Sequence, residues 1–493
     1  MNDADDVFVF PMTPPQRRLW ALDRLSPGDP AYNVPLAFRL RGDVDAAALA
    51  TALAALVERH EVLRTTFGEL DGELVQLVHG AAPLVLEPID APGLDGAALA
   101  DRLVADSRRP FDLVDGPVVR ARLYRLGARD QLLFLELHHI VCDRWSLGIV
   151  AREVMAGYAG RAALPPPAYQ YADYGEWLRG RLTPERLGED LAYWRDALAG
   201  LPPAWQLPRT PGAAQPGVVE RFVPRALADR VAAFARGLGA TPFMPLLAGF
   251  AALLQRYQAG DDLAIGTPVA NREHGAFTGT LGLFVNTLVL RVDAAGEPSL
   301  RQLTGRVRER CLAGYAHQEL PFDVVASELR PGRGDDGRAP LFQAMFAMQN
   351  TPIEGLALAG LEVTPVPLST LALKNELTLI VEDAGPAGLR ATLEIDHQLF
   401  HPAQAAAFLD HYVRLLDGAI AAPDAPLARL PLLDAGERLR LTRGSAPPVE
   451  LAAPRSLVDW FDATAAEHPE RPAVLTSDGA CSLDYRGLAA AAR

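Results

Sequence analysis

Two adjacent histidines and a nearby aspartate, His138, His139 and Asp143 in the string HHIVCDRWS, are the residues best suited to chemistry. A neutral imidazole accepts a proton near neutral pH, and a buried carboxylate fixes geometry by pairing with an arginine or by orienting a ring. Because adjacent strand residues point to opposite faces, one histidine should face a cavity and the other the interior. This pattern alone more often marks structural histidines. A metal site is disfavoured, because no further ligand follows at the right spacing.

The sequence around these residues predicts a strand, a turn and a helix. Residues 118–126 and 131–138 read as the two strands of a hairpin, and residues 147–158 have the apolar spacing of a helix. The two histidines therefore end a strand, and the aspartate lies on the turn before the helix. Upstream, residues 35–40 predict another strand, and Asp45 is placed to cap a helix at 46–58.

Composition excludes several classes of protein. The 493 residues carry a net charge of −14, which opposes binding to nucleic acid. The three cysteines are far apart in the sequence, so we expect neither a disulfide framework nor a zinc cluster, and a reducing cytoplasm fits. The N-terminus does not resemble a secretory signal. The uncharged stretch at 240–255 is too short to span a membrane and predicts a buried core helix.

Proline- and glycine-rich stretches divide the chain. Residues 201–217 indicate a connection between two halves, residues 330–340 resemble a mobile insertion, and residues 444–455 are typical of a linker. We expect an N-terminal lobe at 1–180, a C-terminal lobe at 181–435, a linker at 436–456 and the truncated start of a further domain at 457–493.

Eight motifs follow one another along the chain. In order they are TPPQRRLW at 13–20, RHEVLRTTF at 59–67, HHIVCDR at 138–144, YADYGEW at 171–177, IGTPVANR at 265–272, LFVNTLVLR at 283–291, HQELPFD at 317–323 and PLFQAMFAMQN at 340–350. This series resembles the condensation domains of nonribosomal peptide synthetases, and HHIVCDR resembles their HHxxxDG motif. The end of the chain, from about residue 457, resembles the beginning of an adenylation domain. Each motif alone would be a weak signal, but eight in family order are a strong one.

The resemblance implies a fold and an activity. The fold would be α/β, as an α+β sandwich, with two chloramphenicol-acetyltransferase-like lobes in a V-shaped pseudo-dimer and an active site in a tunnel between them. The activity would be amide formation, in which a downstream carrier-bound aminoacyl amine attacks an upstream carrier-bound acyl or peptidyl thioester. The implied partners are donor and acceptor peptidyl carrier proteins, whose 4′-phosphopantetheine arms enter the tunnel, and an adenylation domain in the same chain. We expect a monomer that binds no cofactor or metal directly and associates with neither nucleic acid nor a membrane.

The resemblance also implies roles for the residues of the active-site motif. His139 would act on the acceptor amine as general base, positioner or stabiliser of positive charge. A model α-amine has a pKa of about 7.7 to 8.0 and imidazole about 6.5, so positioning could supply much of the rate. His138 would orient the loop from inside the fold. Asp143 would form a structural salt bridge with Arg272, and Arg64 is the second choice of partner.

Other residues are expected along the substrate channel. The backbone amides of residues 145–148 would begin a helix and could bind an oxyanion. Arg144 stands where the family usually has glycine, which leaves three interpretations: a gate, a tolerated solvent-directed residue, or impaired catalysis. Ser146 is expected to cap the helix or bind the loop rather than to act as a nucleophile. The residues assigned to the channel or its gate are Arg144, Trp145, Ser146, Gly148 and Asn286.

Three related functions compete with condensation. Epimerisation domains share the fold and the motif, but WSLGIV after the motif and the adenylation-like end favour condensation. Heterocyclisation is disfavoured because both histidines are intact. A non-catalytic domain that recruits a tailoring enzyme is an alternative only because of Arg144. The sequence does not specify the donor, the acceptor amino acid or the product, although an L-configured donor is favoured.

Overall fold

The structure is a computed structural model, in which the chain forms two compact units, residues 1–432 and 433–493. The predicted insertion at 330–340, the predicted linker at 444–455 and most of the proline-rich stretch at 201–217 lie outside the described residues. The structure describes residues 7–80, 84–160, 164–202, 216–272, 274–329, 341–349, 358, 360–366, 368, 373–443, 456–475 and 482–492.

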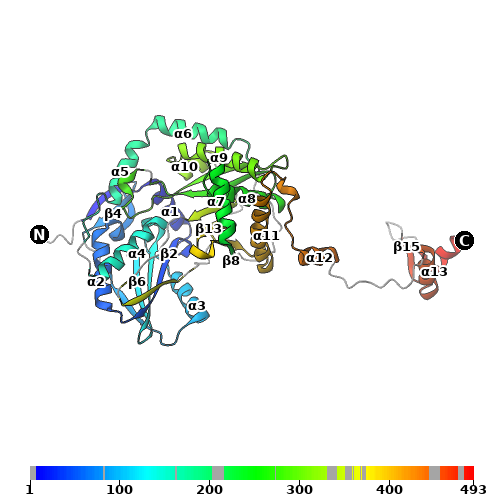
Figure 1. The fold of residues 1–493 in the computed structure, drawn as a ribbon, viewed down its shortest axis with the longest axis horizontal. Helices are drawn as coiled ribbons and strands as arrows, with labels where there is room; N and C mark the ends of the chain where they lie inside the picture. Colours follow the sequence, from blue (N-terminus) through cyan, green and yellow to red (C-terminus); the bar gives the residue numbers. More distant parts are fainter. Residues whose placement is uncertain are drawn as a thin grey trace. The chain divides into compact units, whose positions relative to one another are not determined.

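Two sheets organise the N-terminal lobe of the larger unit (Figure 1). Among the described residues, one sheet has the strand order β12-β2-β7-β6-β5 and the other β1-β4-β3. The strands are β1 Val7–Pro11, β2 Asn33–Gly42, β3 Thr65–Leu70, β4 Glu73–His79, β5 Leu86–Asp90, β6 Val119–Gly127, β7 Asp130–His138 and β12 Leu361–Val366. The helices are α1 Pro14–Leu25, α2 Ala46–Arg59, α3 Gly96–Ser107, α4 Arg144–Tyr158 and α5 Tyr171–Arg181. The next helix, α6 Pro184–Ala197, follows the expected lobe boundary at 180 and packs with the C-terminal lobe.

The predicted elements of this lobe are present. β6 and β7 form the expected antiparallel hairpin, and Asp45 caps α2 by accepting two backbone N–H groups of its first turn. Alternation along β7 sends its side chains to two cores: Leu133 packs in the cluster that contains α2 and α4, and Phe134 in the cluster that contains α3. Both faces of the sheet are therefore covered, and the end of β7 is held firmly in place.

A mixed sheet organises the C-terminal lobe, with the order β10-β9-β11-β13-β14-β8 among the described strands. The predicted core helix at 240–255 is α8, and its residues 244–254 are all buried. No helix in the described part of the chain is long and apolar enough to cross a membrane. The strands are β8 Pro216–Val223, β9 Asp262–Val269, β10 Asn286–Asp293, β11 Ala344–Gln349, β13 Leu377–Asp383 and β14 Leu389–Asp396. The helices are α7 Arg225–Gly237, α8 Phe243–Arg256, α9 Leu300–Ala316, α10 Phe322–Leu329 and α11 Pro402–Ala421.

One strand crosses between the lobes. β12 belongs by sequence to the expected C-terminal lobe, yet it pairs antiparallel with β2 of the N-terminal lobe, with Val363 opposite Leu40. In the same way, Phe277 and Phe284 of the C-terminal lobe pack in the apolar cluster of the N-terminal lobe. The two lobes are therefore tied by the crossing strand β12 as well as by side chains.

The smaller unit has little core. It contains α12 Ala435–Arg443, α13 Leu457–Glu467, β15 Pro472–Leu475, β16 Ser482–Asp484 and α14 Tyr485–Ala491. α12 occupies the first part of the predicted linker at 436–456, because Asp434 and Glu437 form reciprocal capping hydrogen bonds at its start. No described side chain of α13 or α14 is buried.

Candidate active site

The two histidines lie where β7 gives way to α4. His138 is the last residue of β7, and His139–Val141 form one turn of 3-10 helix, so the expectation that both histidines lie on the strand is wrong. His138 is buried, its Nδ1 accepts the Ile140 N–H at 3.2 Å, and its ring meets Phe111 edge-on. His138 therefore holds the turn from inside the fold, as the resemblance implies.

His139 presents one ring nitrogen for chemistry. Its Nδ1 lies 2.7 Å from the carbonyl oxygen of Cys142. Because a carbonyl only accepts, Nδ1 carries the hydrogen and Nε2 keeps its lone pair. Burial, and then the positive charge of Lys374, lower the pKa of His139 to about 3. The imidazole is therefore neutral at physiological pH, and Nε2 can accept a hydrogen bond.

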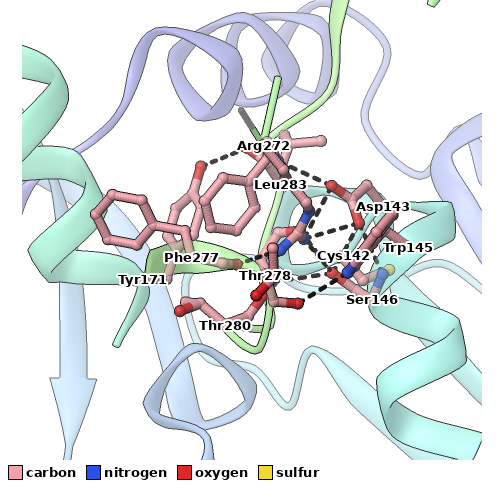
Figure 2. Close-up of polar contacts among 12 residues, drawn as sticks. Cys142, Asp143, Trp145, Ser146, Tyr171, Arg272, Phe277, Thr278, Thr280 and Leu283 are labelled. Atoms are coloured by element: carbon pink, nitrogen blue, oxygen red, sulfur yellow. Dashed lines mark hydrogen bonds and ion pairs between the residues drawn. The ribbon is translucent and has the colours of Figure 1, made fainter. Parts of the chain in front are cut away.

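A buried ion pair joins the loop to the C-terminal lobe (Figure 2). Arg272, just after β9, places Nη2 at 3.1 and 3.2 Å from the two carboxylate oxygens of Asp143, and both side chains are at most 4% exposed. The pairing expected from the resemblance is thus present. Asp143 also accepts the N–H of Phe284 at 3.1 Å, and Arg272 donates to the carbonyls of Phe277 and Thr280. Arg64, the second choice, instead pairs with Glu61.

Ser146 belongs to this network and not to a channel. Its side chain is fully buried, and its hydroxyl contacts Asp143, Gly282 and Arg272 within 2.8 to 3.1 Å. Its backbone N–H donates to the Asp143 carboxylate at 2.8 Å, and the N–H of Leu147 donates to the Asp143 carbonyl at 3.2 Å. Two of the four backbone N–H groups predicted to bind an oxyanion, those of Ser146 and Leu147, are therefore already hydrogen-bonded to Asp143.

Gly148 and Asn286 also differ from the channel assignment. Gly148 lies buried within α4. Asn286 is 8% exposed; its amide nitrogen donates to the carbonyls of Gln318 and Leu320, and its oxygen accepts the N–H of Phe322 at 3.1 Å. Its polar atoms are committed to the loop before α10, so Asn286 fixes that loop.

Arg144 and Trp145 reach toward the other lobe. The Arg144 side chain is 45% exposed, and its Nη2 lies 3.6 Å from a carboxylate oxygen of Glu382 on β13. The Trp145 indole N–H donates to the carbonyl of Thr278 at 2.9 Å. Both side chains of this helix end thus contact the C-terminal lobe.

Sequence reasoning missed two residues near His139. The Tyr32 ring lies 6.5 Å from the His139 ring in an edge arrangement, and the Lys374 Nζ lies 5.2 Å from the centre of the Tyr32 ring. Lys374 is the only lysine of the chain. The sequence shows that this lysine is unique, but only the fold shows that it lies near the His139 loop, which is remote in the sequence.

Fold and site together define a two-lobed α/β protein with a neutral imidazole on a loop that is tied across the lobes, and known proteins share the fold. The family model of the condensation domain matches residues 8–442. One polypeptide of the linear gramicidin synthase of Brevibacillus parabrevis is 39% identical over 473 residues, which are 93% of this chain and 9% of that protein. The X-domain from teicoplanin biosynthesis superposes with a TM-score of 0.77 at 28% identity, covering 86% of this chain and 97% of that one. A four-domain nonribosomal peptide synthetase bound to AMP and glycine gives a TM-score of 0.82 at 22% identity, covering 98% of this chain and 38% of that one.

The chain belongs to the condensation domain family of nonribosomal peptide synthetases. Its fold is the chloramphenicol-acetyltransferase-like fold of solved condensation domains, as the sequence predicted. The chain spans about a tenth or less of the length of the first curated relatives that it matches.

Proposed function

We propose that this chain forms an amide bond between two carrier-bound substrates. The observation that carries the proposal is the state of His139, a neutral imidazole with its Nδ1 hydrogen committed to the Cys142 carbonyl and its lone pair on Nε2. Membership of the condensation family supports the same reaction, and so does the likeness to a linear gramicidin synthase.

The reaction joins a neutral amine to a thioester. The amine lone pair attacks the carbonyl carbon, a C–N bond forms, and the carbonyl π electrons move to oxygen. When they return, the C–S bond breaks and the sulfur leaves with that electron pair. One amine proton is lost and one proton is gained by the thiolate, so the products are an amide and a free thiol. The growing chain thereby moves to the downstream carrier.

His139 would act mainly by positioning the amine and less as a general base that takes up its proton. An imidazole with a pKa of about 3 cannot hold a proton that belongs to a much more basic amine. It can accept an N–H hydrogen bond at Nε2, which orients the amine lone pair toward the thioester and stabilises the positive charge that develops on nitrogen. Asp143 and Arg272 would keep the loop in place for this contact.

The partners follow from the same proposal. Donor and acceptor carrier proteins would deliver their substrates on 4′-phosphopantetheine arms, and an adenylation domain beginning near residue 457 would load the acceptor. Along the sequence, the boundary between the two lobes would lie between residues 180 and 200, and β12 would be the exception because it pairs with the N-terminal lobe. The active site would lie where the two lobes join. Cys142 and Cys311 are buried free thiols, which supports a reducing, cytoplasmic setting.

Arg144 is the residue that would tune this site. The half-exposed cation pairs with Glu382 across the lobes, where the family's usual glycine would leave open space. We expect Arg144→Gly to change the range of acceptor amines or the rate. Unchanged kinetics across several aminoacyl carriers would remove the gate interpretation.

Intact-protein mass spectrometry of a pair of carrier proteins tests the proposal. One carrier is loaded with an acyl or aminoacyl thioester, the other with an aminoacyl thioester, and a panel of substrates is used. Transfer of the acyl mass to the second carrier by the wild-type protein, and its loss in a folded His139→Ala variant, is the expected result. A folded wild-type protein that transfers nothing from the whole panel would overturn the proposal and favour a recruiting role.

A further inference from the structure

Lys374 occupies an unusual position for a charged side chain. It is the only lysine in a chain with 47 basic residues, and it lies just before β13. More than a third of its surface is exposed, yet surrounding protein removes enough water to lower the pKa of its ammonium group. Such a side chain is open to a small ligand, and the partial loss of water around it strengthens its electrostatic effect on its neighbours.

The ammonium group lies beside the reactive loop. Its Nζ is 5.2 Å from the centre of the Tyr32 ring, whose edge contact reaches His139. Among the charges near His139, Lys374 has the largest effect on the pKa of that imidazole, and it also lowers the pKa of His138. The cation therefore acts electrostatically on the histidine that would hold the amine.

No carboxylate within the described residues pairs directly with this ammonium group. Glu394 on β14 stabilises its charge from a greater distance, and Arg18 on α1 opposes it. Tyr32 contributes the negative face of its ring. Glu394 and the Tyr32 ring therefore stabilise the positive charge, and the ammonium group remains available to an incoming anion.

The reaction needs hydrogen-bond donors at the carbonyl oxygen, and a cation is one kind of donor that can serve there. Attack on the thioester places negative charge on the carbonyl oxygen, and preorganised donors at that oxygen are usually the largest contribution to catalysis. The beginning of α4 cannot provide all of them, since Asp143 already accepts the amides of Ser146 and Leu147.

We propose that the Lys374 ammonium group is a catalytic donor that stabilises the negative charge on the thioester carbonyl oxygen. This inference rests on the proposed function. The amine would be held by His139 Nε2 on one side of the reacting carbon, and the oxygen would face the ammonium group. Lys374 gains or loses no proton in the step: it donates a hydrogen bond while the electron pair resides on oxygen, before that pair returns and the sulfur leaves.

Two variants separate charge from shape in the carrier assay. Lys374→Met keeps the length of the side chain but removes the cation, and Lys374→Arg keeps the cation. Loss of one oxyanion donor typically lowers kcat by about 100-fold or more, and it leaves KM nearly unchanged because the ground state is not affected. We expect this split for Lys374→Met, and a kcat at least about tenfold higher for Lys374→Arg. A kcat for Lys374→Met within twofold of wild type, or no advantage for Lys374→Arg, would overturn the inference.

The single lysine also permits a test without mutation. In folded wild-type protein, amine reagents have only Lys374 and the terminal amine to modify. Acetylation removes the charge and should lower kcat about as much as Lys374→Met, whereas reductive dimethylation keeps the charge and one N–H and should preserve most of the rate. Lys374→Arg protein treated with the same reagents reports the effect of the terminal amine. Equal rates for acetylated and dimethylated wild-type protein would contradict the inference even if Lys374→Met does not fold.

Failure of the inference differs from failure of the proposed function. If untreated wild-type protein transfers acyl groups, and neither acetylation nor Lys374→Met changes the rate, the proposed function stands and only the role of Lys374 is overturned. Untreated wild-type protein that transfers nothing overturns both.

Discussion

The carbonyl of Cys142 determines which ring nitrogen of His139 can accept a hydrogen bond from the amine. By accepting the Nδ1 hydrogen at 2.7 Å it fixes the tautomer, and burial keeps the ring neutral. The motif and its resemblance identified His139, but they left open whether it acts as base or positioner. A lone pair on Nε2 and a pKa of about 3 favour the positioner, because the ring binds an N–H well and a proton poorly.

The low pKa values make stability depend on pH in a definite direction. His138 and His139 have pKa values of about 3 in the fold against 6.5 ordinarily. Below pH 6.5 the unfolded chain therefore binds protons that the folded chain does not, so the fold loses stability as pH falls from about 6.5 toward 3, by up to about 1.4 kcal/mol per pH unit for each histidine. Above about pH 7.5 these two histidines contribute no pH dependence.

Urea denaturation at several pH values checks this expectation. Between pH 7.5 and 5.5, the free energy of unfolding should fall less in His139→Gln than in wild type. Nuclear magnetic resonance of the His139 ring gives the direct result: no protonation down to about pH 5. A ring that titrates with a midpoint near 6.5 would contradict this picture.

The Asp143–Arg272 pair should be costly to break. Either Asp143→Ala or Arg272→Ala leaves an unpaired charge in a site where both partners are nearly inaccessible, which costs roughly 3 to 5 kcal/mol. Thermal unfolding should show a large drop, with loss of acyl transfer. The exposed pair of Arg301 and Asp424, at 2.8 Å, is the matched control: Arg301→Ala should leave the melting temperature nearly unchanged, because water already solvates both charges. Similar losses for both arginine variants would show that burial does not govern the difference.

At the scale of elements, the junction between the end of β7, the start of α4 and the segment before β10 depends on one glycine. The amide of Gly282 donates to the Ser146 hydroxyl, and its carbonyl accepts from it. A Cβ atom at Gly282 would lie 2.0 Å from Cδ2 of the buried Tyr171 ring. Tyr171 in turn donates to the Leu283 carbonyl at 2.6 Å, so it has little freedom to move.

Gly282→Ala should therefore destabilise the protein. Overpacking of a tight core typically costs about 1 to 3 kcal/mol, and here it also pushes apart the contacts around Asp143. Gly279→Ala is the control, because a Cβ there meets nothing within 4 Å. The melting temperature of Gly282→Ala should be lower than that of Gly279→Ala. Equal melting temperatures would show that the junction tolerates the extra methyl group.

Elements with a strong local pattern were predictable, and those fixed by distant partners were not. The cap at Asp45, the β6–β7 hairpin and the buried α8 follow from spacing and apolar content within each segment. β12 alternates apolar and polar residues over 361–364, but its choice of β2 depends on edge pairing with the other lobe, which no local pattern specifies. The burial of Ser146 also escaped prediction, because the partner of its hydroxyl, Gly282, is remote in the sequence.

At the scale of the whole molecule, the two units differ in how much they bury. The larger unit has extended clusters of buried apolar side chains, one of them around α8. In the smaller unit, by contrast, apolar residues are exposed, with Leu457 87% and Trp460 49% accessible. Hydrophobic burial provides most of the stability of a domain, so the smaller unit has little to resist local opening.

Hydrogen exchange measured by mass spectrometry should separate the two units. Amides of α13 and α14 should exchange within seconds to minutes, whereas those of α8 and β13 should be protected for hours. The physical reason is the absence of buried side chains in the described helices of the smaller unit. Comparable protection of α13 and α8 would mean that contacts other than those among its described residues stabilise the smaller unit.

The role of His139 is best tested by the single-turnover rate of acyl transfer from a loaded donor carrier to an aminoacyl acceptor carrier, compared between wild type and His139→Ala. Positioning of the amine by a hydrogen-bonding imidazole predicts a rate at least about 100-fold lower for a variant that melts at nearly the wild-type temperature. A folded His139→Ala protein that transfers within twofold of the wild-type rate would contradict this mechanism.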